Sequence, residues 1–195
     1  MNSTAQATAP ALGTLPVWNL DDLYRGTEDP ALAADLAAAK KEAAALNARY
    51  AGKLADLDGD GLADLFEAYE RLAERLGRIS SFAYLYYCTA MQDSARSTFN
   101  KTTQERTTEV WTDLLFVTLE LNKIDDARID ANLAAPRLRR FAPWIRDSRA
   151  FRKYQLSDEV ERLLHERHIV GGAAWGRLFD ETVSEIGRAS CRERV

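Results

Sequence analysis

Cysteine, histidine and proline are scarce in this sequence of 195 residues, and each shortage limits what the chain can be. Two cysteines, Cys88 and Cys191, cannot build the dense disulfide framework of a small secreted protein, so we expect a reducing compartment. Two histidines, His165 and His168, offer few imidazoles for a metal site. With only five prolines and abundant alanine, the composition favours helix throughout.

Long apolar runs and an excess of basic charge are also missing. No stretch approaches the roughly 18 consecutive apolar residues that a membrane span needs. The formal net charge of −4 disfavours a general affinity for nucleic acid or for an anionic membrane. Residues 1–15 lack a basic stretch followed by an apolar run, which predicts a disordered tail and not a signal peptide. We therefore expect a cytoplasmic protein with no nucleic-acid or membrane partner.

Apolar residues that recur at steps of three and four predict amphipathic helices along most of the chain. No stretch alternates as a strand would, so the expected fold class is all-α, a multi-helix bundle. Residues 110–121 are apolar on more than one side and should lie centrally in it. Trp18, Leu20 and Tyr24 are expected to pack onto the first helices from an extended lead-in. The predicted helices cover about residues 30–51, 62–91, 95–123, 125–133, 136–153, 157–171 and 173–185.

The last ten residues, 186–195, break with the amphipathic pattern before them. Arg188, Arg192 and Arg194 appear there without apolar partners. A nucleotide string that encodes this segment resembles a widely used DNA sequencing adapter, and the alternative is a genuine basic C-terminal tail. We expect an adapter-derived artefact, so that the natural protein continues past residue 185 and this chain is a fragment. Removing its three arginines and one glutamate changes the formal net charge from −4 to −6.

An acidic segment, residues 56–67, has the ligand spacing of a calcium-binding loop. Gly61 stands at the sixth position, where an EF-hand loop needs glycine. Ala63 argues against the loop, because a larger apolar residue usually stands there, and no second copy is present. The alternative is an acidic interhelix loop in which Asp60 or Gly61 starts the next helix. The five carboxylates at ligand positions are Asp56, Asp58, Asp60, Asp64 and Glu67.

His165, Glu166 and His168 are a second group of metal-binding residue types. A zincin helix carries His-Glu-x-x-His, because residues four apart share one helix face and converge on one metal ion. Here the histidines are only three apart, and no further cluster of Cys or His exists in the sequence. We therefore expect a solvated helix face, and assign no catalytic, cofactor-binding or metal residue to this chain.

Residues 137–153 are basic with interleaved aromatic residues, a combination that can bind single-stranded nucleic acid. Because the rest of the chain is acidic, ion pairing within the bundle is the better interpretation. A separate aromatic stretch, residues 82–87, has the spacing of a packed core. Cys88 follows it and is expected to be a buried thiol.

Several short stretches match one known family in their order and spacing. They include Trp18, Leu20, Leu23 and Tyr24 in the pattern Trp-x-Leu-x-x-Leu-Tyr. The others are residues 119–122, 141–144, 149–151, 155–164 and 174–181. Together these stretches resemble the oligoendopeptidase F family of zinc metallopeptidases, relatives of thimet oligopeptidase, over residues 18–185.

The resemblance implies a metalloendopeptidase whose N-terminal helices form one wall of a channel that admits short, unstructured peptides. It implies zinc as the cofactor of the full-length enzyme, held by His-Glu-x-x-His and a further Glu in the C-terminal region. These ligands are not in this chain, because residues 165–168 match the motif in neither position nor spacing. The fragment is therefore expected to be inactive alone.

The resemblance also suggests a division of the chain. We expect a tail at residues 1–15, a helical domain at 16–154, the start of the next helical region at 155–185, and the artefact at 186–195. Apolar helix faces should be exposed where the catalytic domain docks, which favours aggregation. The alternative is a self-contained helical binding module that binds calcium through residues 56–67.

Overall fold

The computed structural model describes residues 18–192, and the side chains of all of them except Ser184 and residues 187–192. In this part of the chain there are helices and turns but no strand, so the all-α prediction is confirmed. The predicted disordered tail at residues 1–15 lies outside the described residues. The α-helices are α1 Pro30–Tyr50, α2 Gly59–Cys88, α3 Ser94–Leu114, α4 Phe116–Lys123, α5 Asp126–Asn132, α6 Pro136–Arg139, α7 Ala142–Arg149, α8 Asp158–Arg167 and α9 Gly172–Arg192. The 3-10 helices are η1 Leu54–Asp56 and η2 Arg152–Tyr154.

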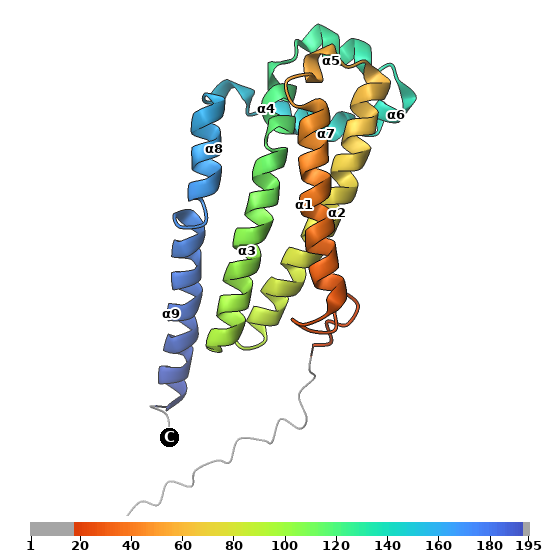
Figure 1. Ribbon diagram of the computed structural model, residues 1–195. Helices are drawn as coiled ribbons and strands as arrows, with labels where there is room; N and C mark the ends of the chain where they lie inside the picture. The colour runs from red at the N-terminus through yellow and green to blue at the C-terminus, as the bar shows by residue number, and fades with distance from the viewer. Residues whose placement is uncertain (1–17, 193–195) are drawn as a thin grey trace, which may run out of the picture.

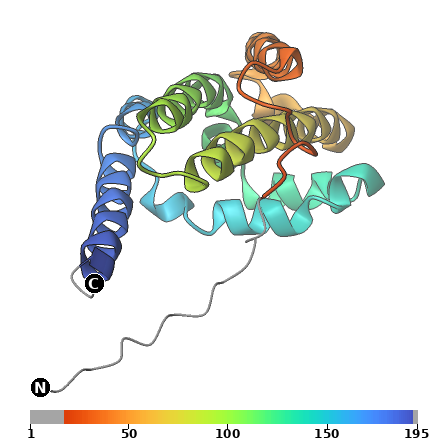
Figure 2. The same ribbon diagram turned by 90° about the horizontal axis from the view of Figure 1, so that it is seen from below.

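Three long helices, α1, α2 and α3, pack against one another along their lengths (Figure 1). The short helices α4 to α7 close over one end of these three. Helices α8 and α9 follow one another along the side of α3 that faces away from α1, as both views show (Figures 1 and 2). Within residues 18–192, no helix has both the length and the apolar character needed to cross a membrane.

The start of α1 follows from its capping residue. The Asp29 carboxylate accepts a hydrogen bond from the Ala31 backbone N–H at 2.9 Å, and Pro30 occupies the first turn, where no backbone donor is needed. The predicted helix from Pro30 to about Ala51 is thereby confirmed.

The predicted single helix over residues 95–123 is wrong, because it is divided at Leu115 into α3 and α4. On either side of the break, threonine hydroxyls donate to backbone carbonyl oxygens. Thr112 Oγ1 bonds the Thr108 oxygen at 2.9 Å, and Thr118 Oγ1 bonds the Leu115 oxygen at 3.2 Å. Such bonds compete with the helix ladder and favour bends.

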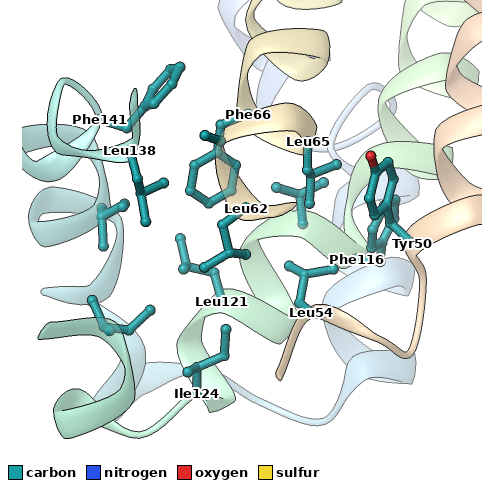
Figure 3. Close-up of a cluster of buried hydrophobic side chains, with 14 residues drawn as sticks. Tyr50, Leu54, Leu62, Leu65, Phe66, Phe116, Leu121, Ile124, Leu138 and Phe141 are labelled. Atoms are coloured by element: carbon teal, nitrogen blue, oxygen red, sulfur yellow. The ribbon is translucent and has the colours of Figure 1, made fainter. Parts of the chain in front are cut away.

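The largest hydrophobic cluster lies where α2 meets the short helices, and Figure 3 shows its side chains. Its buried members come from the end of α1, from η1 and α2, and from the segment that runs from α4 to α7. Phe66 packs edge-on against both Phe141 and Trp144. Val110, Leu114, Phe116, Val117 and Leu121 are all buried, which confirms that residues 110–121 lie centrally.

The lead-in before α1 is anchored by Tyr24 and not by Trp18. Tyr24 is buried against Leu32, Ile79 and Phe82, and its hydroxyl donates to Asp35 Oδ2 at 2.8 Å. Burial and this hydrogen bond raise the pKa of Tyr24. Trp18 remains 64% exposed, so the prediction that it packs onto the first helices is wrong. The turn from Leu20 to Tyr24 brings the tyrosine, and not the tryptophan, between α1 and α2.

Candidate functional site

The acidic segment at residues 56–67 is mostly helical. Asp56 ends η1, and Asp58 caps α2 by accepting from the Gly61 backbone N–H at 2.8 Å. Helix α2 therefore begins at Gly59, three residues before the predicted start at Leu62, and the cap is Asp58 in place of Asp60 or Gly61. Helical backbone over the later part of the segment places Asp60, Asp64 and Glu67 along one face of α2, and does not wrap them around a central ion as a calcium loop does.

Close packing against the end of α5 requires glycine at the first position of α2. A Cβ atom at position 59 would collide with the Asn132 carbonyl oxygen and would stand 2.6 Å from the Ala135 Cβ. Asn132 Nδ2 also donates to the Leu57 carbonyl oxygen at 3.3 Å. The glycine at position 59 is therefore used for helix packing, and only Gly fits there.

Two other carboxylates of the acidic segment bind an arginine. Arg137 Nη2, on α6, lies 2.7 Å from Asp64 Oδ1 and 2.8 Å from Glu67 Oε2. The hydrogen bond from Arg137 holds the pKa of the Glu67 carboxyl below its usual range. Among the side chains that the structure describes, no three from His, Cys, Asp and Glu converge to hold a metal ion. This arrangement gives the calcium-binding hypothesis no support.

Replacing Asp58 with alanine should lower the free energy of unfolding by about 1 kcal/mol, because the first turn of α2 loses its capping acceptor. The variant Asp58→Asn should retain most of the stability, since an amide oxygen also accepts from a backbone N–H. Urea denaturation of the three proteins, with and without calcium, measures both effects. A calcium-dependent gain in stability that both variants abolish would contradict the capping role.

Basic residues of the 137–153 stretch pair with acids of the bundle, as the sequence predicts. Arg140 Nη2 lies 2.5 Å from Glu70 Oε2, beside the Arg137 pairs already described. Arg149 and Arg152 both bind the Asp126 carboxylate, at 2.6 and 2.7 Å. These arginines lower the pKa of Asp126. Most of the positive charge in this stretch is therefore matched by acids of the same chain.

The pair between Arg137 and Glu67 makes a pH-dependent prediction. Because the folded-state pKa of Glu67 is lowered, the pair stabilises the protein above the pKa of an unfolded glutamate and is lost as pH falls through the folded pKa. Arg137→Ala should raise the Glu67 titration midpoint towards the ordinary value, as measured by NMR of the carboxyl carbon. Arg146→Ala is the control, since among the residues that the structure describes Arg146 pairs only with its neighbour Asp147. An unchanged midpoint in Arg137→Ala would contradict the assignment.

The three residues that resemble part of a zinc motif differ in burial. On α8, His165 is half-buried, and its Nε2 atom has no hydrogen-bond partner among the described residues. Glu166 and His168 are exposed, which agrees with the predicted solvated helix face. The half-buried His165 does not agree with it. With one imidazole half-buried and the other exposed beyond the end of the helix, these residues do not fit a zinc ion.

Cys88 is half-buried, so the prediction of a buried thiol is wrong. It is the last residue of α2, where the helix ends and fewer neighbours cover it. Cys88, through a hydrogen bond and then through its charge, raises the pKa of Tyr84, and burial raises it further. Tyr84 lies one turn earlier and is 48% exposed. Phe82 and Tyr87 of the same aromatic stretch are buried, so its interpretation as core holds for these two residues.

The most unusual surface belongs to α8 and α9, which together are called the arm here. The exposed side of the arm is apolar, and its aromatic members Trp175 and Phe179 are 72% and 66% exposed. This set is called the arm face: Val160, Leu163, Leu164, Trp175, Leu178, Phe179, Val183 and Ile186. Isolated apolar residues at a surface are ordinary, but eight large apolar side chains exposed on one helix pair are typical of an interaction site. The expectation of exposed apolar helix faces is confirmed.

The opposite side of the arm, which contacts the body of the protein, is polar. Glu161, His165, Arg177 and Asp180 are half-buried. Arg177 Nη1 donates to Gln104 Oε1 of α3 at 3.4 Å, a weak contact. The arm therefore turns its polar side to its own bundle and its apolar side to solvent, the reverse of a helix that packs onto a core.

The junction between bundle and arm is formed by Gln155. Its amide accepts from Asn122 Nδ2 at 2.7 Å and donates to the Leu119 carbonyl oxygen at 3.3 Å, which ties the segment before α8 to α4. Lys123 Nζ also pairs with Asp158 at the start of α8. Sequence reasoning found no role for Gln155, because a side chain that bonds a backbone carbonyl leaves no spacing pattern.

Residues 120–187, which include the second half of α4, all of α5 to α8 and most of α9, match the family described as oligopeptidase F. The oligopeptidase F match covers about a third of the sequence, and it contains both the Gln155 junction and the arm face. It confirms the resemblance found in the sequence and relates the chain to peptidases. No curated protein and no solved structure matches the chain. Whether residues 186–195 derive from an adapter is not tested by the match.

Backbone helix continues through Gly187 to Arg192. The sequence predicts that the amphipathic pattern stops after Gly187, and the described side chains extend only to Ile186. The division of the chain at residues 154 and 185 stays a prediction, although the segment from Phe151 to Ser157 does separate the bundle from the arm.

Proposed function

We propose that this chain forms the N-terminal wall of the peptide channel in a zinc metalloendopeptidase that hydrolyses internal bonds of short peptides. The observation that carries the proposal is the arm face, because it lies within the segment that matches oligopeptidase F. A helix pair that turns its apolar side away from its own bundle is suited to contact further protein. We propose that this further protein is the catalytic part of the same enzyme.

No catalytic or metal residue is assigned to this chain. Its only two histidines do not converge, and no group of three metal-binding side chains exists among those described. The residues here do not fit zinc, so no step of peptide hydrolysis is derived from them. We propose that the zinc ligands lie outside residues 1–195, that the chain alone is inactive, and that the enzyme is cytoplasmic.

The decisive experiment extends the reading frame. Genomic DNA that follows codon 185 should continue into an open frame containing His-Glu-x-x-His. The extended protein should hydrolyse a short quenched-fluorescence peptide, and a zinc chelator should abolish this activity. The 195-residue chain is the matched control and should not hydrolyse the peptide.

Two outcomes would contradict the proposal. One is chelator-sensitive hydrolysis by the 195-residue chain itself, which would place a metal site within it. The other is a natural stop codon without any metallopeptidase core downstream. The calcium-binding module is the second candidate function. Because Asp58 caps α2 and Asp64 and Glu67 bind Arg137, a calcium titration of the chain should give no heat of binding.

A further inference from the structure

We infer that the arm is a hinged element that swings away from α3 as one body, with its pivot between Gln155 and Leu156. The inference goes beyond the proposed function, because it concerns a motion within the chain and not the hydrolysis of peptides. It rests on three observations: where the anchoring hydrogen bonds change sides, how weakly the arm is held against α3, and which polar atoms the closed arrangement buries.

The anchoring hydrogen bonds change from the bundle to the arm between two adjacent residues. The Gln155 side chain is fixed to α4, because it bonds Asn122 and the Leu119 carbonyl oxygen. The Leu156 backbone N–H is fixed to α8, because it donates to Glu161 Oε1 at 2.8 Å. Rotation about the backbone bonds between Gln155 and Leu156 therefore moves the arm and breaks neither set of hydrogen bonds. Hinges are typically a few residues at the ends of elements that absorb such a change.

Beyond this pivot, the arm is held against the bundle weakly. Lys123 Nζ pairs with Asp158 Oδ2 at 2.6 Å, but both side chains are more than half exposed, and water and salt screen such a pair. The contact from Arg177 to Gln104, at 3.4 Å, lies at the limit of a hydrogen bond. Among the described residues, none of the arm belongs to a hydrophobic cluster. Elements with so few buried apolar contacts open at low cost.

The closed arrangement also buries polar atoms that have no hydrogen-bond partner among the described residues. One is His165 Nε2 on α8, the helix that packs against α3. Another is the Tyr87 hydroxyl on α2. Burial, and then the Glu181 and Asp180 carboxylates of α9, raise the pKa of Tyr87, so α9 lies near a hydroxyl that it does not bond. Buried polar atoms without partners disfavour the closed arrangement, and opening the arm returns His165 to water.

The length of the arm makes this motion measurable. Helices α8 and α9 follow one another away from the pivot (Figure 1). At about 1.5 Å per helical residue, the end of the arm near residue 185 lies about 40 Å from the pivot. A rotation of about 20° therefore moves that end by about 14 Å.

Double electron–electron resonance tests the motion on the whole chain, with Cys88→Ser and Cys191→Ser as the background. Spin labels at Lys101→Cys on α3 and Glu185→Cys on α9, both exposed positions, report the distance at the far end of the arm. Dilution with unlabelled chain restricts the signal to distances within one molecule. We expect two populations, the longer distance exceeding the shorter by at least about 10 Å. The control pair, Lys41→Cys on α1 with Lys101→Cys, lies within the bundle and should give a single distance.

A charge reversal tests what holds the arm closed. Lys123→Glu should raise the ratio of open to closed molecules about 3-fold to 5-fold, because repulsion of Asp158 replaces attraction. Lys40→Glu is the matched control: it reverses one charge of the exposed pair with Glu109, which joins α1 to α3, and should leave the ratio unchanged.

A single distance as narrow as that of the control pair, in both the unaltered chain and Lys123→Glu, would overturn the inference. So would a long distance that appears only with a loss of helix content in circular dichroism, because it would report unfolding of α9 and not rotation of the arm. Neither result bears on peptide hydrolysis by the extended enzyme, so the two proposals fail separately.

Discussion

Phe66→Ala should lower the free energy of unfolding by about 3–5 kcal/mol. The Phe66 ring is 1% exposed and lies at the centre of the largest cluster, with its centroid 5.6 Å from that of Phe141 and 5.1 Å from that of Trp144. Removing it leaves a cavity between α2 and α7, and rigid helix backbones around that cavity limit how far it can collapse. Urea denaturation followed by circular dichroism measures the loss.

Trp18→Ala is the control for that measurement. Trp18 is 64% exposed, so its removal should change the free energy of unfolding by no more than about 0.5 kcal/mol. Equal losses in the two variants would mean that the cluster around Phe66 does not hold the short helices to α2.

Arg149→Ala should have the next largest effect, a loss of about 2–4 kcal/mol. The Arg149 side chain is only 8% exposed, and its guanidinium donates to the carbonyl oxygens of Leu121 and Ile124 and to the Asp126 carboxylate. It thereby satisfies acceptors at the end of α4 and fixes the turn into α5. Alanine would leave these carbonyl oxygens without donors in a partly buried position.

Arg146→Ala provides a matched control on the same helix, one turn earlier. Arg146 is 75% exposed, and Asp147 is its one ion-pair partner in the described part of the chain, so its loss should cost no more than about 0.5 kcal/mol. Arg149→Lys separates charge from geometry, because an ammonium keeps the charge but cannot bond several acceptors in one plane. If Arg149→Lys has the same free energy of unfolding as the unaltered chain, the planar guanidinium contacts do not account for the stabilisation by Arg149.

Much of the fold was predictable, because helical periodicity and capping are local properties. The start of α1 at Pro30 and the central position of residues 110–121 follow from the sequence alone. The break at Leu115 does not, because the periodicity of apolar residues runs on through it. The need for glycine at position 59 depends on the approach of Asn132, which is 73 residues further along the chain and leaves no trace in the local pattern.

At the candidate sites, too, contacts between residues distant in sequence could not be predicted from local spacing. The spacing of acids at residues 56–67 satisfies a calcium motif, yet capping by Asp58 and pairing with Arg137 determine where the carboxylates point. The ion pairs of the 137–153 stretch were predicted from charge balance, but not their partners. Exposed apolar helix faces were expected because the family resemblance implied a docking surface, but the helices that carry them were not predicted. The orientation of the arm face away from α3 could not be predicted, because an amphipathic pattern does not say which side of a helix faces the bundle.

The contents of the three hydrophobic clusters have a consequence for how the chain comes apart. All of their buried members lie between Tyr24 and Ile145, and among the described side chains none after Ile145 is buried. A protease that cuts the exposed segment between Phe151 and Leu156 would thus remove the arm without opening any cluster. The remainder, ending near residue 150, should persist as a digestion-resistant species that melts cooperatively by itself.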